Sequence, residues 1–105
     1  MRNINQIEWR ELVANDQSAV IIDTRTLIEW KDGILENAIL MDVFESESFQ
    51  VNSRQLEKEK NYYVYCRSGQ RSQRACQVLE ALGVANTFNL SGGILEWNGN
   101  IVMPT

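Results

Sequence analysis

Short apolar runs and longer amphipathic segments alternate along this chain. Three apolar runs have the composition of strands, at residues 19–22, 38–41 and 62–65, and the more polar residues 86–90 are expected to form a last strand. The first of these runs is continuous and rich in β-branched residues, which is typical of a parallel strand covered on both faces. We therefore expect a sheet whose central strands are buried.

Helical spacing predicts helices between these runs. Residues 4–14 are expected to form one or two residues of an edge strand and then a helix that Asn5 caps. In the polar segment 44–60, helical patches are expected around residues 49–51 and over residues 53–60. After Ser72, apolar side chains recur at positions 75, 78, 79 and 82, which predicts a helix that Ser72 caps and Gly83 ends.

Strands that alternate with helices indicate the α/β class. We expect a central parallel sheet with helices on both faces, in one domain over residues 1–105. No apolar stretch reaches the roughly 18 residues of a membrane-spanning helix. The N-terminal residues also lack the apolar stretch of a secretory signal. We therefore expect a cytoplasmic protein that has no membrane partner.

The junction after the run 62–65 carries the main candidate for chemistry. Cys66 would end the strand, and a short segment would lead into the helix: Arg67, Ser68, Gly69, Gln70, Arg71 and Ser72. Because this segment has no proline, every residue keeps its N–H group, and a tight loop can turn these donors toward the sulfur. Such a field favours the thiolate, which is the nucleophile. The arginines could bind an oxyanion, and Gly69 permits a close backbone approach.

The numbers of cysteine and histidine residues limit how Cys66 can be activated and which metals the chain could bind. The chain has two cysteines and no histidine, which excludes activation of a cysteine by histidine and most zinc sites. We expect neither a metal nor a cofactor, so Cys66 must be activated by amides and arginines. Cys76 falls on the helix after the loop, and we interpret it as a buried, inert thiol rather than a resolving cysteine.

The distribution of charge points to a small anionic substrate. The net charge of −4 argues against a nucleic-acid partner. The segment from residue 60 to residue 79 nevertheless has no acidic residue, and its basic residues are Lys60, Arg67, Arg71 and Arg74. The other six basic residues are outnumbered by all 14 acidic ones. Positive charge is thus gathered around the cysteine loop.

The segment from Cys66 to Ser72 resembles the active-site loop of the rhodanese sulfurtransferases, in the form common among single-domain members. The resemblance implies that Cys66 takes a sulfane sulfur from thiosulfate or a related persulfide donor and holds it as a persulfide. A low-molecular-weight thiol, cyanide or a protein thiol would then accept the sulfur. Arg67 and Arg71 would hold the sulfonate end of the donor. Protein tyrosine phosphatases use a similar loop with one residue more between cysteine and arginine, and the shorter spacing favours sulfur over phosphate.

Two further segments carry the resemblance over most of the chain. Asp23 and Arg25 match an Asp-x-Arg strand end, and we expect them to support the site, with Arg25 in a structural ion pair with Glu29. The alternative is direct contact with the substrate pocket, because ligands of open α/β folds bind at the carboxyl ends of strands. The segment from Gly92 to Trp97 resembles the closing segment of rhodanese domains. We expect the glycine backbone there to approach the cysteine loop, and Trp97 to anchor a short helix on the sheet.

Other positions are less informative or depart from the family. Residues 33–38 replace the histidine, proline and second glycine of a Gly-His-Ile-Pro-Gly-Ala run that many rhodanese domains carry. Core packing is the expected role of Phe44 and Phe49, with pocket walls as the alternative. We expect the charged residues 57–60 to form a solvated helix face.

Two alternatives to thiosulfate sulfurtransferase activity stay open. The domain could be a sulfur carrier or a regulatory, partner-binding module, whose persulfide one protein delivers and another removes. Phosphatase-like or arsenate-reducing chemistry at the same loop is the other alternative, and the short loop disfavours it.

Overall fold

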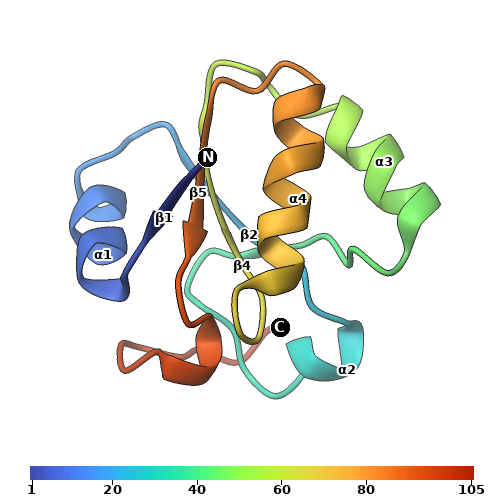
Figure 1. Ribbon diagram of the computed structural model, residues 1–105. Coiled ribbons are helices and arrows are strands. Elements are labelled where there is room, and N and C mark those ends of the chain that lie inside the picture. The colour runs from blue at the N-terminus through green and yellow to red at the C-terminus, as the bar shows by residue number, and fades with distance from the viewer.

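Five parallel strands form the central sheet of the computed structural model, which describes all 105 residues (Figure 1). Their order in the sheet is β1-β5-β4-β2-β3. Their bounds are β1 (Arg2–Ile4), β2 (Ala19–Asp23), β3 (Ile39–Leu40), β4 (Asn61–Tyr65) and β5 (Asn86–Leu90). Every pairing is parallel, as the sequence predicts. The edge strand β3 is shorter than its apolar run.

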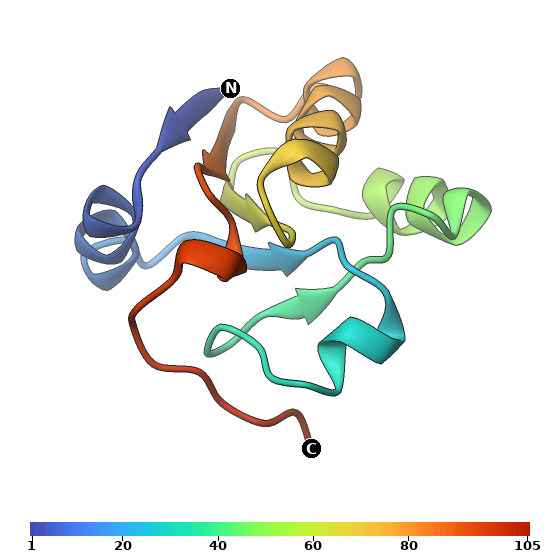
Figure 2. The same ribbon diagram turned by 60° about the horizontal axis from the view of Figure 1, so that its bottom comes forward.

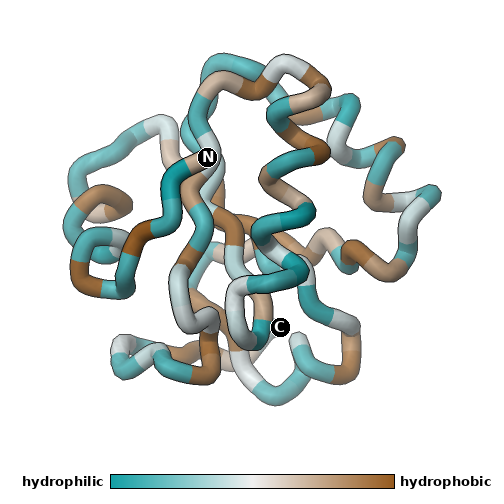
Figure 3. The backbone as a smooth tube through the Cα atoms, in the orientation of Figure 1, coloured by the Kyte–Doolittle hydropathy of each residue, from teal (hydrophilic) through white to brown (hydrophobic).

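Helices cover both faces of this sheet, which confirms the expected α/β architecture. Their bounds are α1 (Gln6–Ala14), α2 (Leu27–Trp30), α3 (Ser46–Arg54) and α4 (Gln70–Ala81), with a 3-10 turn η1 (Ile94–Glu96). Brown and teal segments alternate along α4, as expected of a helix with one buried face (Figure 3). None of the helices combines the length and the apolar character needed to cross a bilayer.

Alternating side chains of β4 divide the core into two clusters. Tyr62 and Val64 face α3 and α4 and pack with Phe49, whose predicted core position is confirmed. Tyr63 and Tyr65 face the opposite way and pack against Trp9 of α1, with ring centroids 5.4 and 6.3 Å from the Trp9 ring. The central strand is therefore held from both sides by large side chains, and its carboxyl end is fixed in position.

Three local predictions are wrong. Phe44 is 68% exposed instead of packed in the core, because its amide donates to the Asp42 carboxylate at 2.8 Å in a turn that keeps the ring outside. Helix α3 ends at Arg54 rather than continuing to Lys60, because the chain turns there to enter β4. Helix α4 begins at Gln70 after Gly69, so Ser72 is not its cap.

The segment after η1 crosses the side of the sheet that carries α1 and returns to the loop before β3 (Figure 2). Val102 forms an antiparallel bridge with Ile34 there. Asn37, which stands where many of the rhodanese domains that the sequence resembles have a glycine, has a φ of +68°. Asparagine is one of the few residues that tolerate this left-handed conformation, so the turn persists without the glycine.

Candidate active site

Cys66 lies immediately after β4, at the edge of the sheet where the carboxyl ends of the parallel strands meet. Ligands of open α/β folds bind at this edge. The cysteine is 1% exposed and forms no disulfide. The next residues form a tight loop that enters α4 at Gln70, as the sequence predicts.

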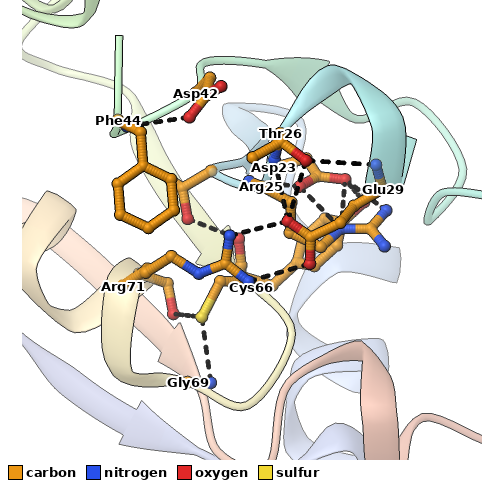
Figure 4. Close-up of polar contacts among 12 residues, drawn as sticks. Asp23, Arg25, Thr26, Glu29, Asp42, Phe44, Cys66, Gly69 and Arg71 are labelled. Atoms are coloured by element: carbon orange, nitrogen blue, oxygen red, sulfur yellow. Dashed lines mark hydrogen bonds and ion pairs between the residues drawn. The ribbon is translucent and has the colours of Figure 1, made fainter. Parts of the chain in front are cut away.

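Contacts on the outer side of the loop orient its peptide groups. The amides of Ile94 and Leu95 donate to the carbonyl oxygens of Cys66 and Arg67, both at 3.0 Å. With these carbonyls turned outward, the following amides point inward, and the Gly69 amide donates to the Cys66 Sγ at 3.1 Å (Figure 4). The loop thus forms the predicted nest of donors around the sulfur.

The Gly92–Gly93 turn makes these outer contacts possible. Gly93 has a φ of +61°, and a Cβ at this position would lie 2.3 Å from the Arg67 carbonyl oxygen. The expected close approach of this backbone to the cysteine loop is therefore confirmed. Trp97, which follows η1, is half-buried and packs against the core cluster on the α1 side, as expected of an anchor.

The surroundings of the sulfur favour the thiolate. Burial raises the pKa of the Cys66 thiol, but hydrogen bonds from the Ser72 hydroxyl and from the amides of Ser72, Gly69 and Ser68 outweigh burial and lower the pKa below its usual value. Burial in the apolar core instead raises the pKa of Cys76 to about 12. The two cysteines therefore differ in character as the sequence predicts, with Cys76 held as a thiol.

Ser72 and Asn89 form a second, buried layer behind the cysteine. The Ser72 Oγ lies 3.4 Å from the Cys66 Sγ and 2.5 Å from the Asn89 Oδ1. The Asn89 side-chain amide donates to the Gly69 carbonyl at 3.1 Å and to the Asn3 Oδ1 at 2.9 Å. Sequence reasoning missed Asn89, whose only signal is a polar residue between the apolar residues Phe88 and Leu90 of β5.

The guanidinium of Arg71 is paired with Glu29 rather than free. Its two terminal nitrogens donate to the two carboxylate oxygens of Glu29 at 2.8 and 2.9 Å (Figure 4). The pair lowers the pKa of Glu29 to about 2. The guanidinium carbon also lies 5.3 Å from the centre of the exposed Phe44 ring. The expected ion pair between Arg25 and Glu29 is therefore wrong, because α2 turns Glu29 toward the cysteine loop.

Asp23 and Arg25 belong to a separate buried network. The Asp23 carboxylate accepts three hydrogen bonds of 2.8 to 3.1 Å from the Arg25 side chain and one of 2.6 Å from the Tyr65 hydroxyl. Arg25 also donates to the Gly33 carbonyl, and the Tyr65 oxygen accepts from the Leu35 amide. These bonds tie the end of β2 to the following loops, and none of them reaches Cys66.

The remaining predicted site residues lie on the surface beside the loop. Arg67, Ser68 and Gln70 are exposed, and Arg67 forms no salt bridge. A shallow depression of about 410 Å³ adjoins the start of α4, and its lining residues are Val43, Phe44, Gln70, Arg71 and Arg74. Positive and aromatic groups thus surround the approach to the loop.

Comparison with known proteins identifies the class that this fold and loop define. The chain belongs to the rhodanese-like domain family, whose model matches residues 7–100. A rhodanese-like domain protein from Staphylococcus aureus has the same fold, with a TM-score of 0.86 and 26% identity over 100% of both chains.

Relatives of known description are sulfurtransferases or contain a similar domain. A sulfurtransferase of Allochromatium vinosum is 29% identical, over 90% of this chain and 88% of its own. A mitochondrial protein of Schizosaccharomyces pombe, described as a candidate thiosulfate sulfurtransferase, is 35% identical over 82% of this chain and 68% of its own. The chain also spans 33% of a longer relative, a tRNA uridine(34) hydroxylase of Pelagibacter ubique. The chain is thus a rhodanese-like homologue of sulfurtransferases.

Proposed function

We propose that this protein is a sulfurtransferase that carries a sulfane sulfur as a persulfide on Cys66. The observation that carries the proposal is the buried Cys66 Sγ, which accepts a hydrogen bond from the Gly69 amide inside a loop whose other amides also lower the thiol pKa. An anionic sulfur in this position is a nucleophile, and after loading it is the anchor of an anionic persulfide.

In the loading step, the Cys66 thiolate attacks the outer sulfur of thiosulfate. The new bond joins this sulfur to the Cys66 Sγ, the S–S bond of thiosulfate breaks, and sulfite leaves with the bonding electrons. Loop amides stabilise the negative charge on the persulfide. Arg67, which has no acidic partner, attracts the sulfonate end of the donor. Arg71 helps to bind the sulfonate only if the donor displaces Glu29 from the Arg71 guanidinium.

In the unloading step, a thiolate or cyanide attacks the outer sulfur of the persulfide. The bond between that sulfur and the Cys66 Sγ breaks, and Cys66 leaves as a thiolate that the same amides stabilise. The product is a persulfide of the acceptor thiol, or thiocyanate. The exposed rim of the loop leaves room for either a small thiol or the thiol of another protein.

The Arg71–Glu29 pair favours one alternative, in which the domain carries sulfur between proteins and uses thiosulfate poorly. Both terminal nitrogens of Arg71 are bound by Glu29, so the charge available to a free sulfonate is reduced. A persulfide delivered by another protein needs no such anion site, because the contact between the two proteins positions it.

Intact mass spectrometry tests the proposal, with the two cysteines as matched sites. We expect the wild type and Cys76→Ser to gain the mass of one sulfur atom after thiosulfate, and to lose it after cyanide, while Cys66→Ser gains nothing. Loading only by a cysteine desulfurase and its substrate would select the carrier alternative. If neither donor loads Cys66, or if Cys66→Ser is loaded as well as the wild type, the proposal is wrong.

A further inference from the structure

The orientation of the Asn89 side chain is determined by its neighbours. Its amide nitrogen lies 3.1 Å from the Gly69 carbonyl oxygen, which can only accept a hydrogen bond. The nitrogen therefore faces Gly69, and the oxygen of the same side chain faces the Ser72 hydroxyl. Asn89 thus presents a fixed acceptor to Ser72.

Ser72 has one hydroxyl proton and two candidate acceptors for it. The Asn89 Oδ1 is 2.5 Å from the Ser72 Oγ, whereas the Cys66 Sγ is 3.4 Å away. While Cys66 is protonated, its sulfur is a weak acceptor and the Asn89 amide oxygen a strong one, so the proton points to Asn89 and the lone pairs of the Ser72 oxygen face the sulfur. Once Cys66 is a thiolate, the hydroxyl can turn and donate to the sulfur instead. A protonated Cys66 fits this arrangement, because its S–H can donate to the Ser72 Oγ and complete a chain from Cys66 through Ser72 to Asn89.

Ionisation of Cys66 breaks this chain. A thiolate cannot donate, so the Ser72 lone pairs would face a negative sulfur unless the hydroxyl turns its proton toward it. When the hydroxyl turns, the Asn89 oxygen loses its partner at a position where Ser72 is 0% and Asn89 3% exposed. Thiolate formation therefore sacrifices one buried hydrogen bond, and Asn89 competes with the thiolate for the only side-chain donor in the nest.

We propose that Asn89 is a positioning residue that, by holding the Ser72 hydroxyl, disfavours the Cys66 thiolate and slows its departure from the persulfide. This inference rests on the proposed function for its consequence, since Cys66 leaves as a thiolate when the acceptor attacks. In the persulfide the Cys66 Sγ is uncharged, and the bond between Ser72 and Asn89 is retained. The loop amides stabilise the Cys66 thiolate, and Asn89 opposes this stabilisation. Asn89 thereby slows the release of sulfur from the persulfide before an acceptor has bound.

The ionisation of Cys66 tests this inference without any sulfur donor. The rate at which iodoacetamide alkylates Cys66 is measured against pH, with the modified site located by mass spectrometry. The midpoint of this pH–rate curve, here called the alkylation midpoint, marks the pH at which half of Cys66 is ionised. We expect Asn89→Ala to lower the alkylation midpoint by about 0.5 to 1 pH unit, because Ser72 is then free to donate to the thiolate. In a Ser72→Ala background the same Asn89→Ala change is expected to leave the midpoint in place.

Two control variants distinguish this specific effect from a general increase in the flexibility of the loop. Asn89→Asp keeps an acceptor for Ser72 and adds negative charge, so the midpoint is expected to rise. Asn86→Ala removes a side-chain hydrogen bond from the exposed start of β5 and is expected to change nothing. An equal shift from Asn89→Ala with and without Ser72, or an upward shift, would overturn the inference.

The same measurements distinguish a failure of the proposed function from a failure of the role of Asn89. If Cys66 never loads sulfur, the alkylation midpoints still report on Asn89 and Ser72. If loading occurs and the inference holds, Asn89→Ala is expected to release its sulfur to cyanide several-fold faster than the wild type. Unchanged midpoints in a protein that loads sulfur normally would reject the role of Asn89 and leave the sulfurtransferase intact.

Discussion

Arg71 and Glu29 hold each other by two parallel hydrogen bonds of 2.8 and 2.9 Å, although 42 residues separate them along the chain. The pair joins the first turn of α4 to α2 across the mouth of the cysteine loop (Figure 4). It keeps the loop in place and at the same time neutralises the charge of a guanidinium beside the loop.

Replacement of Glu29 by glutamine should therefore change binding and stability in opposite directions. The released Arg71 is expected to lower the KM for thiosulfate by roughly threefold, because more positive charge faces the donor. The free energy of unfolding should fall by about 1 kcal/mol, since the ion pair is partly exposed. Steady-state kinetics and urea unfolding measure the two effects. Glu47→Gln on α3 removes the same charge without breaking an ion pair, and a KM that falls equally in this variant would contradict the role of Glu29.

The same pair predicts how stability depends on pH. Arg71 lowers the pKa of Glu29 from 4.5 to about 2, so the folded state keeps this carboxylate ionised at a pH where the unfolded chain protonates it. The stabilisation is thus fully present above about pH 4.5 and is lost as the pH falls toward 2. Urea unfolding gives the free energy of unfolding of the wild type and of Glu29→Gln at each pH between 6 and 2. Plotted against pH, the two free-energy curves should converge as the pH falls. Curves that stay equally far apart would rule out Glu29 as the titrating group.

The Asp23 network predicts a larger loss of stability. Asp23→Asn leaves the buried Arg25 guanidinium without its counter-charge, and we expect a loss of about 3 to 5 kcal/mol in the free energy of unfolding. Replacing both residues together, as Asp23→Leu with Arg25→Met, should cost less than the sum of the single changes, because no unpaired charge remains. Denaturant unfolding of Asp23→Leu, Arg25→Met and the double variant gives the three values of this comparison, and strict additivity would show that the two residues act independently.

Much of the fold is predictable from sequence because its signals are local. Continuous apolar runs mark the strands β2 and β4, and a cysteine between a strand and a helix marks the loop that joins β4 to α4. The difference between Cys66 and Cys76 is also local, since one lies in a loop of free amides and the other on the apolar face of a helix.

The pairing of side chains is not predictable in the same way. Glu29 is close in sequence to Arg25, yet it binds Arg71, because the orientation of α2 against the loop decides which guanidinium it reaches. Asn89 looks like a polar interruption of a strand, and only the folded chain shows that it contacts Ser72. Serine is a common helix cap, which is why Ser72 is predicted to cap α4. The helix instead begins at Gln70, after the left-handed Gly69, so the Ser72 hydroxyl lies within its first turn and points inward.

Gly93 gives the sharpest test of how the cysteine loop is oriented. A Cβ at this position would lie 2.3 and 2.5 Å from the carbonyl oxygen and carbon of Arg67, which are backbone atoms that cannot yield. Gly93→Ala should therefore push η1 away from the loop and break the bonds from the Ile94 and Leu95 amides. We expect a loss of about 3 kcal/mol in the free energy of unfolding.

Gly83→Ala is the matched control, because Gly83 also has a positive φ, of +97°, but its nearest neighbours are side-chain carbons of Lys58 at 3.4 and 3.6 Å. Its cost should be the backbone strain alone, about 1 kcal/mol. Gly93→Ala should also raise the alkylation midpoint of Cys66, since the loop amides no longer converge on the sulfur, whereas Gly83→Ala should leave it unchanged. Equal losses of stability and equal midpoints in both variants would mean that backbone conformation, rather than the close contact with Arg67, requires glycine at position 93.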